Sequence, residues 1–205
     1  MFTLLLGVAP RAEAKNEHVV VAALGAGYHT FNKRDGVRKD PFYNDITGGL
    51  TSYVSADWFF ADRFGLGLRD TTVLSGGLRD IGGVRTVDTI NLNTFMVTAN
   101  YFPVIFGDGY FRVGLLGGYG SATYRHDIDA LTSSSYETSG TASMMGGYFD
   151  WGGDGFGAKL GYTTMNTDLD KLNQGGTKLS VDGSGAHWFF SFRWAITEAM
   201  WRAGQ

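Results

Sequence analysis

Six charged side chains interrupt segments that otherwise alternate between large apolar residues and small or polar ones. They lie on the small-residue face of their segments and are Asp57, Arg69, Arg112, Asp150, Lys159 and Arg193. Charges persist in a narrow interior only when they are paired and hydrogen-bonded. The pattern therefore predicts a belt of ion pairs that ties the segments together; the alternative is a ring of charges that selects ions in a pore.

The histidines give little support to nucleophilic catalysis. His187 and Ser191 share one face of a segment, but four residues along a strand span about 13 Å, too far for a nucleophile–base pair. His126 stands beside Asp127 and Asp129, where a solvated surface is the simpler interpretation. We therefore expect no enzymatic activity.

Metal and cofactor sites also lack their usual residues. The chain has no Cys, which excludes thiolate nucleophiles and zinc–thiolate sites. Asp168, Asp170 and Asn173 lack the Gly and the terminal Glu of a calcium loop. We expect neither a metal nor a cofactor.

Alternation with a period of two predicts the strands that must position these residues. Within Ile46–Trp58, for example, Val54 and Trp58 share one face, and Ser55 and Asp57 share the other. Eight such strands are predicted, over residues 19–31, 46–58, 64–74, 89–101, 110–119, 138–151, 156–164 and 186–196. The fourth changes phase near Thr94, which predicts a β-bulge there.

The connections between these strands are of two kinds. Tight polar or Gly-rich turns alternate with long polar segments that we predict to be loops, over residues 32–45, 75–88, 122–137 and 166–184. Aromatic residues flank the three tight turns, and another lies near the end of the last strand. The predicted girdle on this side comprises Trp58, Phe64, Tyr101, Phe111, Trp151, Phe156 and Trp194. A transmembrane β-barrel has two such different ends, with aromatic girdles at the membrane interfaces.

The chemistry of the two faces predicts which one meets lipid. A soluble, lipocalin-like barrel hides its apolar face inside, but eight strands enclose a space just wide enough for side chains. Five bulky residues per strand would not fit there, whereas Gly, Ser and Thr would. The fold class predicted is all-β, an eight-stranded antiparallel up-and-down transmembrane barrel with short periplasmic turns and long extracellular loops.

Composition sets further limits. The chain has 205 residues, enough for one domain, and a net charge of −3, which argues against nucleic-acid binding. Residues 1–14 are typical of a signal peptide without its basic start. Residues 17–197 are expected to form the barrel domain and residues 198–205 a tail. No apolar run reaches the roughly 18 residues of a membrane-spanning helix. If the chain crosses a membrane, it must therefore do so with the strands of a closed barrel.

The first long loop carries four cations among acidic residues. They are Lys33, Arg34, Arg38 and Lys39. Such side chains suit contacts with lipopolysaccharide phosphates. A solvated loop of mixed charge is the alternative.

Two stretches resemble hairpins of the small eight-stranded outer-membrane barrels of Gram-negative bacteria, the class of the OmpA transmembrane domain, OmpX, OmpW and the opacity proteins. They are Trp58–Leu68 and Tyr110–Gly120, each an aromatic turn beside a Gly-rich strand. The resemblance implies an integral, cell-envelope protein of the bacterial outer membrane, a monomer, whose partners are outer-membrane lipid, lipopolysaccharide and the outer-membrane assembly machinery.

Three roles follow from this resemblance. The leading expectation is a structural or surface-interaction role without catalysis. A narrow, porin-like channel for small or hydrophobic compounds, as in OmpW-like barrels, is the alternative. A lipid A-modifying enzyme is less favoured, because lipid A deacylases of this architecture carry a His-x-Ser pair on a strand and this sequence has none.

Overall fold

A computed structural model describes residues 19–32, 47–61, 63–81, 84–107, 111–129, 134–152, 155–174 and 176–197. The predicted signal peptide, the tail 198–205 and the four loop cations Lys33, Arg34, Arg38 and Lys39 lie outside the described residues. Within them, no helix is long and apolar enough to cross a membrane.

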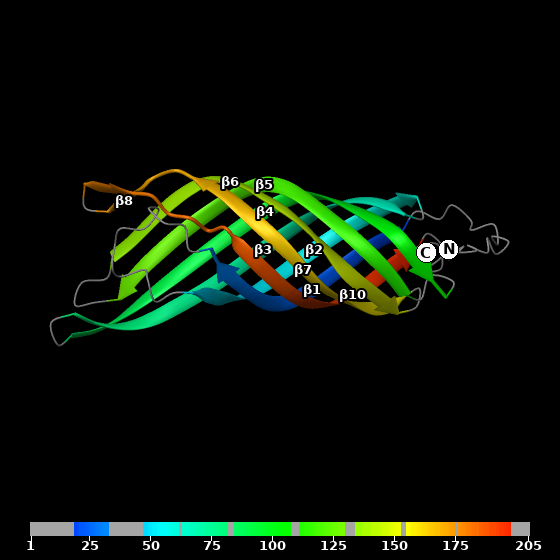
Figure 1. Cartoon of the computed structure of the whole chain (residues 1–205), viewed down its shortest axis with the longest axis horizontal. Helices are drawn as coiled ribbons and strands as arrows, with labels where there is room; N and C mark the ends of the chain where they lie inside the picture. The colour runs from blue at the N-terminus through cyan, green and yellow to red at the C-terminus, as the bar shows by residue number, and fades with distance from the viewer. Residues whose placement is uncertain are drawn as a thin grey trace, which may run out of the picture.

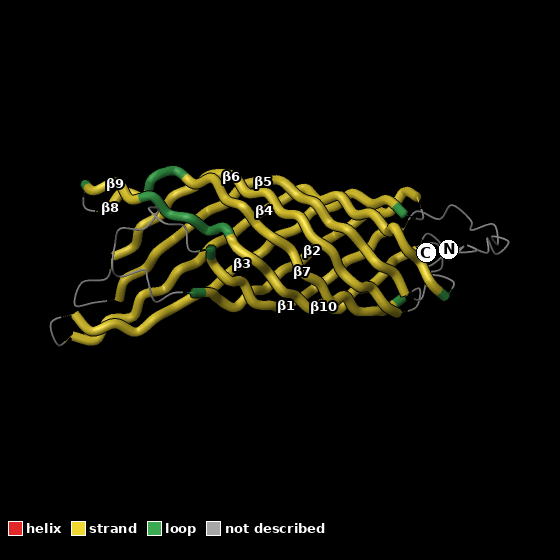
Figure 2. Tube along the Cα trace, in the orientation of Figure 1, coloured by secondary structure: helices red, strands yellow, loops and turns green. Residues whose placement is uncertain are grey.

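Eight long strands form one closed antiparallel barrel (Figures 1 and 2). Around the barrel their order is β1, β10, β7, β6, β5, β4, β3, β2. The strands are β1 (Val19–Phe31), β2 (Gly48–Ala61), β3 (Phe64–Ile81), β4 (Val84–Phe106), β5 (Phe111–Asp129), β6 (Ser134–Gly152), β7 (Phe156–Leu169) and β10 (Gly185–Thr197). The predicted eight-stranded up-and-down fold is confirmed.

The barrel has two unlike ends. At the turn end, short connections join β2 to β3, β4 to β5 and β6 to β7, and β1 begins beside the end of β10. At the loop end, a small hairpin of β8 (Leu172–Gln174) and β9 (Thr177–Leu179) follows β7 and projects from the barrel (Figure 2). The two ends therefore differ as predicted, although at the loop end extended hairpins take the place of two of the four predicted loops.

The register fixes how steeply the strands tilt. Hydrogen-bonded partners followed once around the barrel lead from Val21 through Asp57, Thr98 and Met144 to Phe31, a displacement of ten residues along β1. A stagger of this size over eight strands corresponds to a tilt of roughly 35–45°. The tilt lets strands far apart in sequence direct side chains into one layer of the lumen.

Inward and outward side chains alternate as expected. On β2, Ser55 and Asp57 are buried in the lumen, while Val54 and Trp58 are about half exposed on the outer surface. Most large apolar residues of the other strands also point outward, so the outer face is apolar, as predicted from the chemistry of the faces.

Two predicted loops are largely strand. β3 continues to Ile81 and pairs with β4 from Val84, and β5 continues to Asp129 against β6 from Ser134. Residues 75–88 and 122–137 lack an apolar face, which is why they read as loops. Antiparallel pairing depends on backbone hydrogen bonds and continues where both faces of the sheet are polar.

The bulge predicted near Thr94 is absent from the described pairing. The partners of β4 run without a shift from Val84 to Tyr101, and the irregularity lies between Tyr101 and Val104 instead. The phase seemed to change because Ile90, Leu92 and Met96 are apolar and nevertheless point inward.

The lumen is also richer in large side chains than the sequence suggested. Fully or almost fully buried there are Tyr53, Phe59, Met96, Phe102, Tyr124, Tyr148 and Phe189. Lumen-facing glycines make room for them. A Cβ at Gly114 would meet the ring of Tyr148, and a Cβ at Gly161 would meet the ring of Phe189.

Candidate functional site

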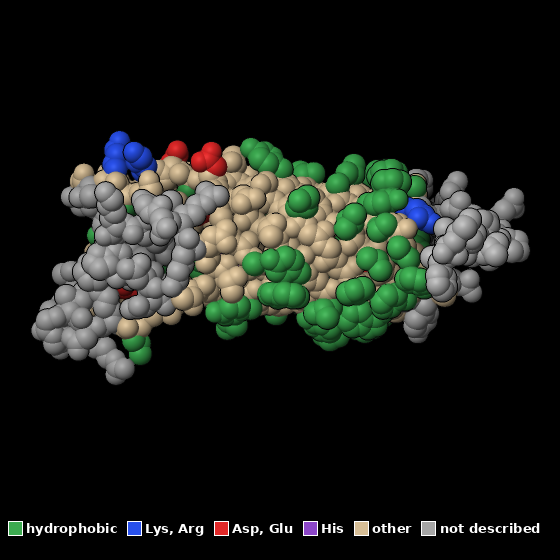
Figure 3. Space-filling view, viewed as in Figure 1, with side chains coloured by type: hydrophobic (Ala, Val, Ile, Leu, Met, Phe, Trp, Pro, Cys, Tyr) green, Lys and Arg blue, Asp and Glu red, His purple; other side chains and the backbone are tan. Residues whose placement is uncertain are grey.

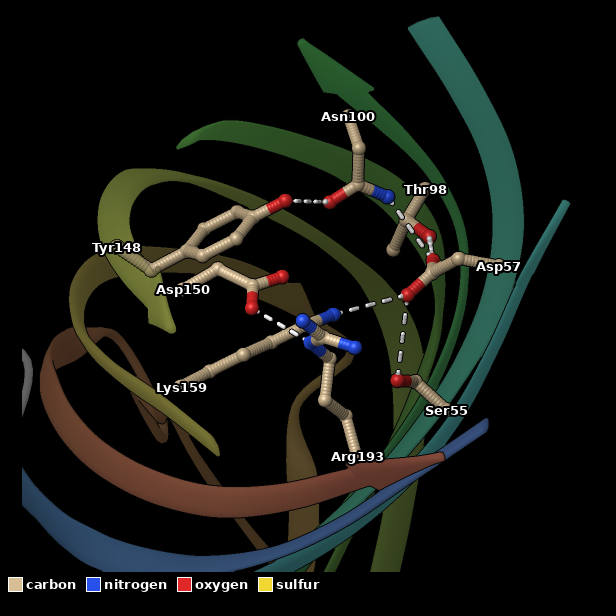
Figure 4. Close-up of polar contacts among 8 residues, drawn as sticks. All are labelled: Ser55, Asp57, Thr98, Asn100, Tyr148, Asp150, Lys159 and Arg193. Carbon is tan, nitrogen blue, oxygen red and sulfur yellow. Dashed lines mark hydrogen bonds and ion pairs between the residues drawn. The ribbon is translucent and has the colours of Figure 1, made fainter. Parts of the chain in front are cut away.

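The lumen near the turn end contains a polar network centred on Asp57 of β2 (Figure 4). Lys159 of β7 donates to its Oδ2 at 3.5 Å. Its Oδ1 accepts from Asn100 Nδ2 at 2.9 Å and from Thr98 Oγ1 at 3.3 Å, both on β4. Tyr148 of β6 extends the network by donating to Asn100 Oδ1 at 3.0 Å. Side chains of four strands are thus linked in one network around a buried carboxylate.

A second ion pair lies beside the first. Arg193 of β10 donates through Nε to Asp150 of β6 at 2.5 Å, and its Nη2 donates to the carbonyl of Gly152 at 3.3 Å. Both charged side chains are almost fully buried. The pair joins two strands that are separated by β7 in the barrel.

The other two predicted belt residues stack on aromatic rings. The guanidinium carbon of Arg69 lies 3.8 Å from the centre of the Tyr53 ring and 4.8 Å from that of Phe189. The guanidinium carbon of Arg112 lies 5.3 Å from the centre of the Phe102 ring. Cation–π contacts of this kind stabilise a cation that has lost its hydration shell. The six predicted residues therefore lie in one region of the lumen, held by two ion pairs and two aromatic stacks.

Sequence reasoning missed the uncharged members of this network. Thr98, Asn100 and Tyr148 carry no charge to mark them, and the supposed bulge at Thr94 obscured the phase of β4. Unbroken alternation from Thr86 to Phe102 would have placed Thr98 and Asn100 in the lumen.

Little free space remains in this region. A cavity of about 10 Å³, lined by Asp57, Arg69, Lys159 and their neighbours, has room for a single water molecule. The network is therefore a packed layer across the lumen.

The loop end of the lumen is filled by a returning segment of the chain. Val181–Ser184, here called the plug segment, is buried although it follows the outer hairpin of β8 and β9. Gly183 donates its N–H to Thr167 Oγ1 at 2.9 Å, and its carbonyl oxygen lies 3.1 Å from Nε2 of His29. Asn32 donates its N–H to the carbonyl of Ser184 at 2.8 Å. The segment 166–184, predicted to be a loop, thus includes residues that fill part of the lumen.

His187 lies on the inner face of β10 close to His29. Its Nε2 is 2.8 Å from Oγ1 of Thr51, and its ring centre is 6.4 Å from that of His29. These side chains are at most 5% exposed. A hydroxyl–imidazole pair is present, but it lies within the packed interior, where a substrate would have to displace neighbouring side chains.

The seven predicted girdle residues gather at the turn end of the outer surface. Trp58, Phe64, Phe111, Trp151, Phe156 and Trp194 are between 37% and 54% exposed. The remaining residue, Tyr101, stacks on Phe64 with ring centres 4.7 Å apart. On the face shown in Figure 3, hydrophobic side chains crowd the half toward the turn end.

Metal-binding geometry is not found in the described part of the chain, where no three His, Asp or Glu side chains converge. Comparison by sequence gives no lead either. No protein-family model matches the chain, and no curated protein matches it.

Comparison by structure identifies the fold. A major outer-membrane protein from Thermus thermophilus superimposes with a TM-score of 0.58, at 11% identity over 87% of this chain and 99% of that one. The attachment invasion locus protein Ail of Yersinia pestis, in complex with the heparin analogue sucrose octasulfate, gives 0.56, at 11% identity over 89% and 100%. OprG of Pseudomonas aeruginosa gives 0.51, at 15% identity over 88% and 96%. The chain therefore has the fold of small outer-membrane barrels.

Proposed function

We propose that this chain is an integral barrel of the bacterial outer membrane, closed to ions and without catalytic activity, that acts as a structural or surface-interaction protein. One observation carries the proposal: a packed lumen of polar and aromatic side chains is enclosed by an apolar outer face. Trp188, Leu50 and Met145 are 58%, 71% and 72% exposed on that face. Soluble monomers rarely expose contiguous apolar surface beyond a few hundred Å².

The filled lumen supports a closed barrel. The network around Asp57 crosses the lumen near the turn end, and the plug segment fills it near the loop end. Conduction would require water to replace both layers. For the same reason, the hydroxyl of Thr51 beside His187 is poorly placed for attack on a lipid.

Membrane position supports the expected partners. Outer-membrane lipid would surround the apolar face, with the aromatic girdle at the periplasmic interface. Insertion would use the outer-membrane assembly machinery, and lipopolysaccharide would contact the outer leaflet side of a monomeric barrel.

The test is refolding of the full chain into lipid vesicles, followed by gel electrophoresis of boiled and unboiled samples and by conductance in planar bilayers. We expect a heat-dependent mobility shift and no stable conductance. Steady single-channel steps would overturn the closed barrel in favour of the OmpW-like channel. A soluble monomer in plain buffer would favour a lipocalin-like barrel.

Catalysis needs its own measurement. Mass spectrometry of lipid A from cells with and without the protein should give identical spectra. A mass change that depends on the protein would establish a lipid A-modifying enzyme instead.

A further inference from the structure

The outward-facing side chains of β5 change their chemistry in a fixed order toward the loop end. Leu115 and Tyr119 are exposed on the apolar part of the outer face. Ser121 and Thr123 follow, and Arg125 comes next near the tip of the strand. The order is apolar, aromatic, hydroxyl and then charged.

Neighbouring strands repeat this order. Outward residues run from Phe95 to Asn93 and Asn91 on β4, from Met145 to Ser143, Thr141, Ser139 and Glu137 on β6, and from Tyr162 to Thr164, Asn166 and Asp168 on β7. β5, β6 and β7 keep this order to their loop ends. On β3 and β4 the outward residues Leu74, Leu78 and Val87 are apolar and exposed again toward the loop end, so the order is clearest on the side formed by β5, β6 and β7.

The uncharged polar residues form a continuous patch. Thr72, Asn93, Thr123 and Ser139 pair in register across β3, β4, β5 and β6. Directly paired residues of adjacent strands lie about 4.5–5.5 Å apart at Cβ, so their side chains can act on one ligand. This patch, here called the hydroxyl–amide belt, comprises Thr72, Asn91, Asn93, Ser121, Thr123, Ser139, Thr141, Ser143, Thr164 and Asn166.

The composition of the belt identifies its surroundings. A sheet in contact with acyl chains carries apolar residues, and a surface in bulk water usually carries many Lys, Arg, Glu and Asp. Outward-facing charged residues lie beyond the belt on β5, β6 and β7, at Arg125, Asp127, Glu137 and Asp168. Asp70 of β3 is the exception, because it pairs with Phe95 on the apolar side of the belt. The belt lies between these two regions and is directly continuous with the lipid-facing surface.

The charges around the belt indicate which part of a glycolipid headgroup, the phosphates or the sugars, the belt would contact. The belt includes no Lys or Arg, and carboxylates of Asp70 and Asp168 border it on β3 and β7. Arg125 also borders it, paired in register with Asn91, but its charge is compensated by Asp127 at 2.9 Å. Such a surface does not favour phosphate. Neutral hydroxyl and amide groups instead match sugar hydroxyls, which both donate and accept hydrogen bonds.

We propose that the hydroxyl–amide belt binds the saccharide of an outer-leaflet glycolipid through hydrogen bonds from its Ser, Thr and Asn side chains. The proposal rests on the membrane position given under the proposed function. It places saccharide contact on one side of the barrel, because β1, β2 and β10 end at Phe31, Gly48 and Gly185. These contacts differ in chemistry from the phosphate contacts predicted for the cations of the first loop.

The first experiment uses the lack of native cysteine to attach one nitroxide label at Thr123→Cys. The labelled full chain is inserted into vesicles whose outer leaflet holds either lipid A alone or lipid A with a complete core saccharide. Collisions with a water-soluble nickel chelate should fall severalfold in the second membrane. A label at Val97→Cys, on the apolar face, should stay inaccessible to the chelate in both.

The second experiment measures preference for the saccharide directly. A fluorescent glycolipid with the core saccharide competes with phospholipid for the barrel, and Asn93→Val, Thr123→Val and Ser139→Ala are combined in one variant. Loss of three hydrogen-bonding groups should weaken the preference roughly tenfold. Thr30→Val is the matched control, because Thr30 is exposed on the outer face of β1, which β2 and β10 separate from the belt strands, and it should leave the preference unchanged. Removing the phosphates of the glycolipid should leave the effect of the triple variant in place.

The outcomes separate the two proposals. A chain that does not insert, or shows no heat-dependent mobility shift, contradicts the membrane position itself. An inserted barrel whose Thr123→Cys label is equally accessible in both membranes overturns saccharide contact alone. The same holds for a triple variant that retains the wild-type preference, or for a preference that vanishes with the phosphates.

Discussion

Lys159 and Asp57 form a buried ion pair between two strands that are not neighbours. Their nitrogen and oxygen atoms are 3.5 Å apart, yet β10 and β1 lie between β7 and β2 in the barrel. The pair therefore fastens the barrel across the seam where the first and last strands meet.

Removing one partner of this pair should be costly. Lys159→Met leaves the Asp57 carboxylate buried without its cation, which typically costs about 3–5 kcal/mol. Adding Asp57→Asn should recover part of the loss, because the amide removes the unpaired charge and keeps an oxygen that accepts from Asn100 and Thr98. Urea unfolding in vesicles, followed by tryptophan fluorescence, measures both changes. A double variant less stable than Lys159→Met would contradict this account.

Arg193 and Arg69 should respond differently to the same substitution. Arg193→Met leaves Asp150 without its ion pair, whereas Arg69→Met removes a stack on Tyr53 and Phe189. We expect a loss of about 3–5 kcal/mol for the first and about 1–2 kcal/mol for the second. Equal losses in the same urea titration would mean that the carboxylate of Asp150 does not depend on Arg193.

Two glycines of β5 form a matched pair. A Cβ at Gly114 would run into the Tyr148 ring, whereas a Cβ at Gly117 meets nothing within 4 Å. Gly114→Ala should therefore cost about 1–3 kcal/mol through overpacking. Gly117→Ala should be neutral or stabilising by less than about 1 kcal/mol, because it lowers the entropy of the unfolded chain. Thermal loss of the unboiled gel band compares them; similar midpoints would count against glycine as the source of lumen space.

Hydrogen exchange can measure the local stability of the plug segment. Thr167→Val removes the acceptor of the Gly183 N–H. Hydrogen exchange of this amide should then accelerate roughly tenfold, the equivalent of about 1.4 kcal/mol. Thr164→Val, on the outer face of the same strand, is the control and should leave the exchange of Gly183 unchanged. Unchanged exchange in Thr167→Val would show that the segment is held by its other contacts.

The sequence alone determined the architecture because lipid imposes a simple rule. Apolar side chains at every second position, as at Val54 and Trp58, lie on the outer face, and in a membrane backbone groups must pair within a closed sheet. The number of strands, their facing and the girdle at the turn end follow from that rule. The six charged lumen residues could also be found, because a charge on the inner face stands out among Gly, Ser and Thr.

Only the tertiary structure decided how the lumen is filled and how far the sheet extends. The displacement of ten residues around the barrel determines which side chains share a layer, and it brings Asp57 to Lys159 and Asn100. The alternation of residues within a single strand carries no information about this displacement between strands. The polar ends of β3 to β6 read as loops because backbone pairing leaves no mark on side-chain hydrophobicity. The return of Val181–Ser184 into the lumen likewise depends on contacts with His29 and Thr167, which only folding brings together.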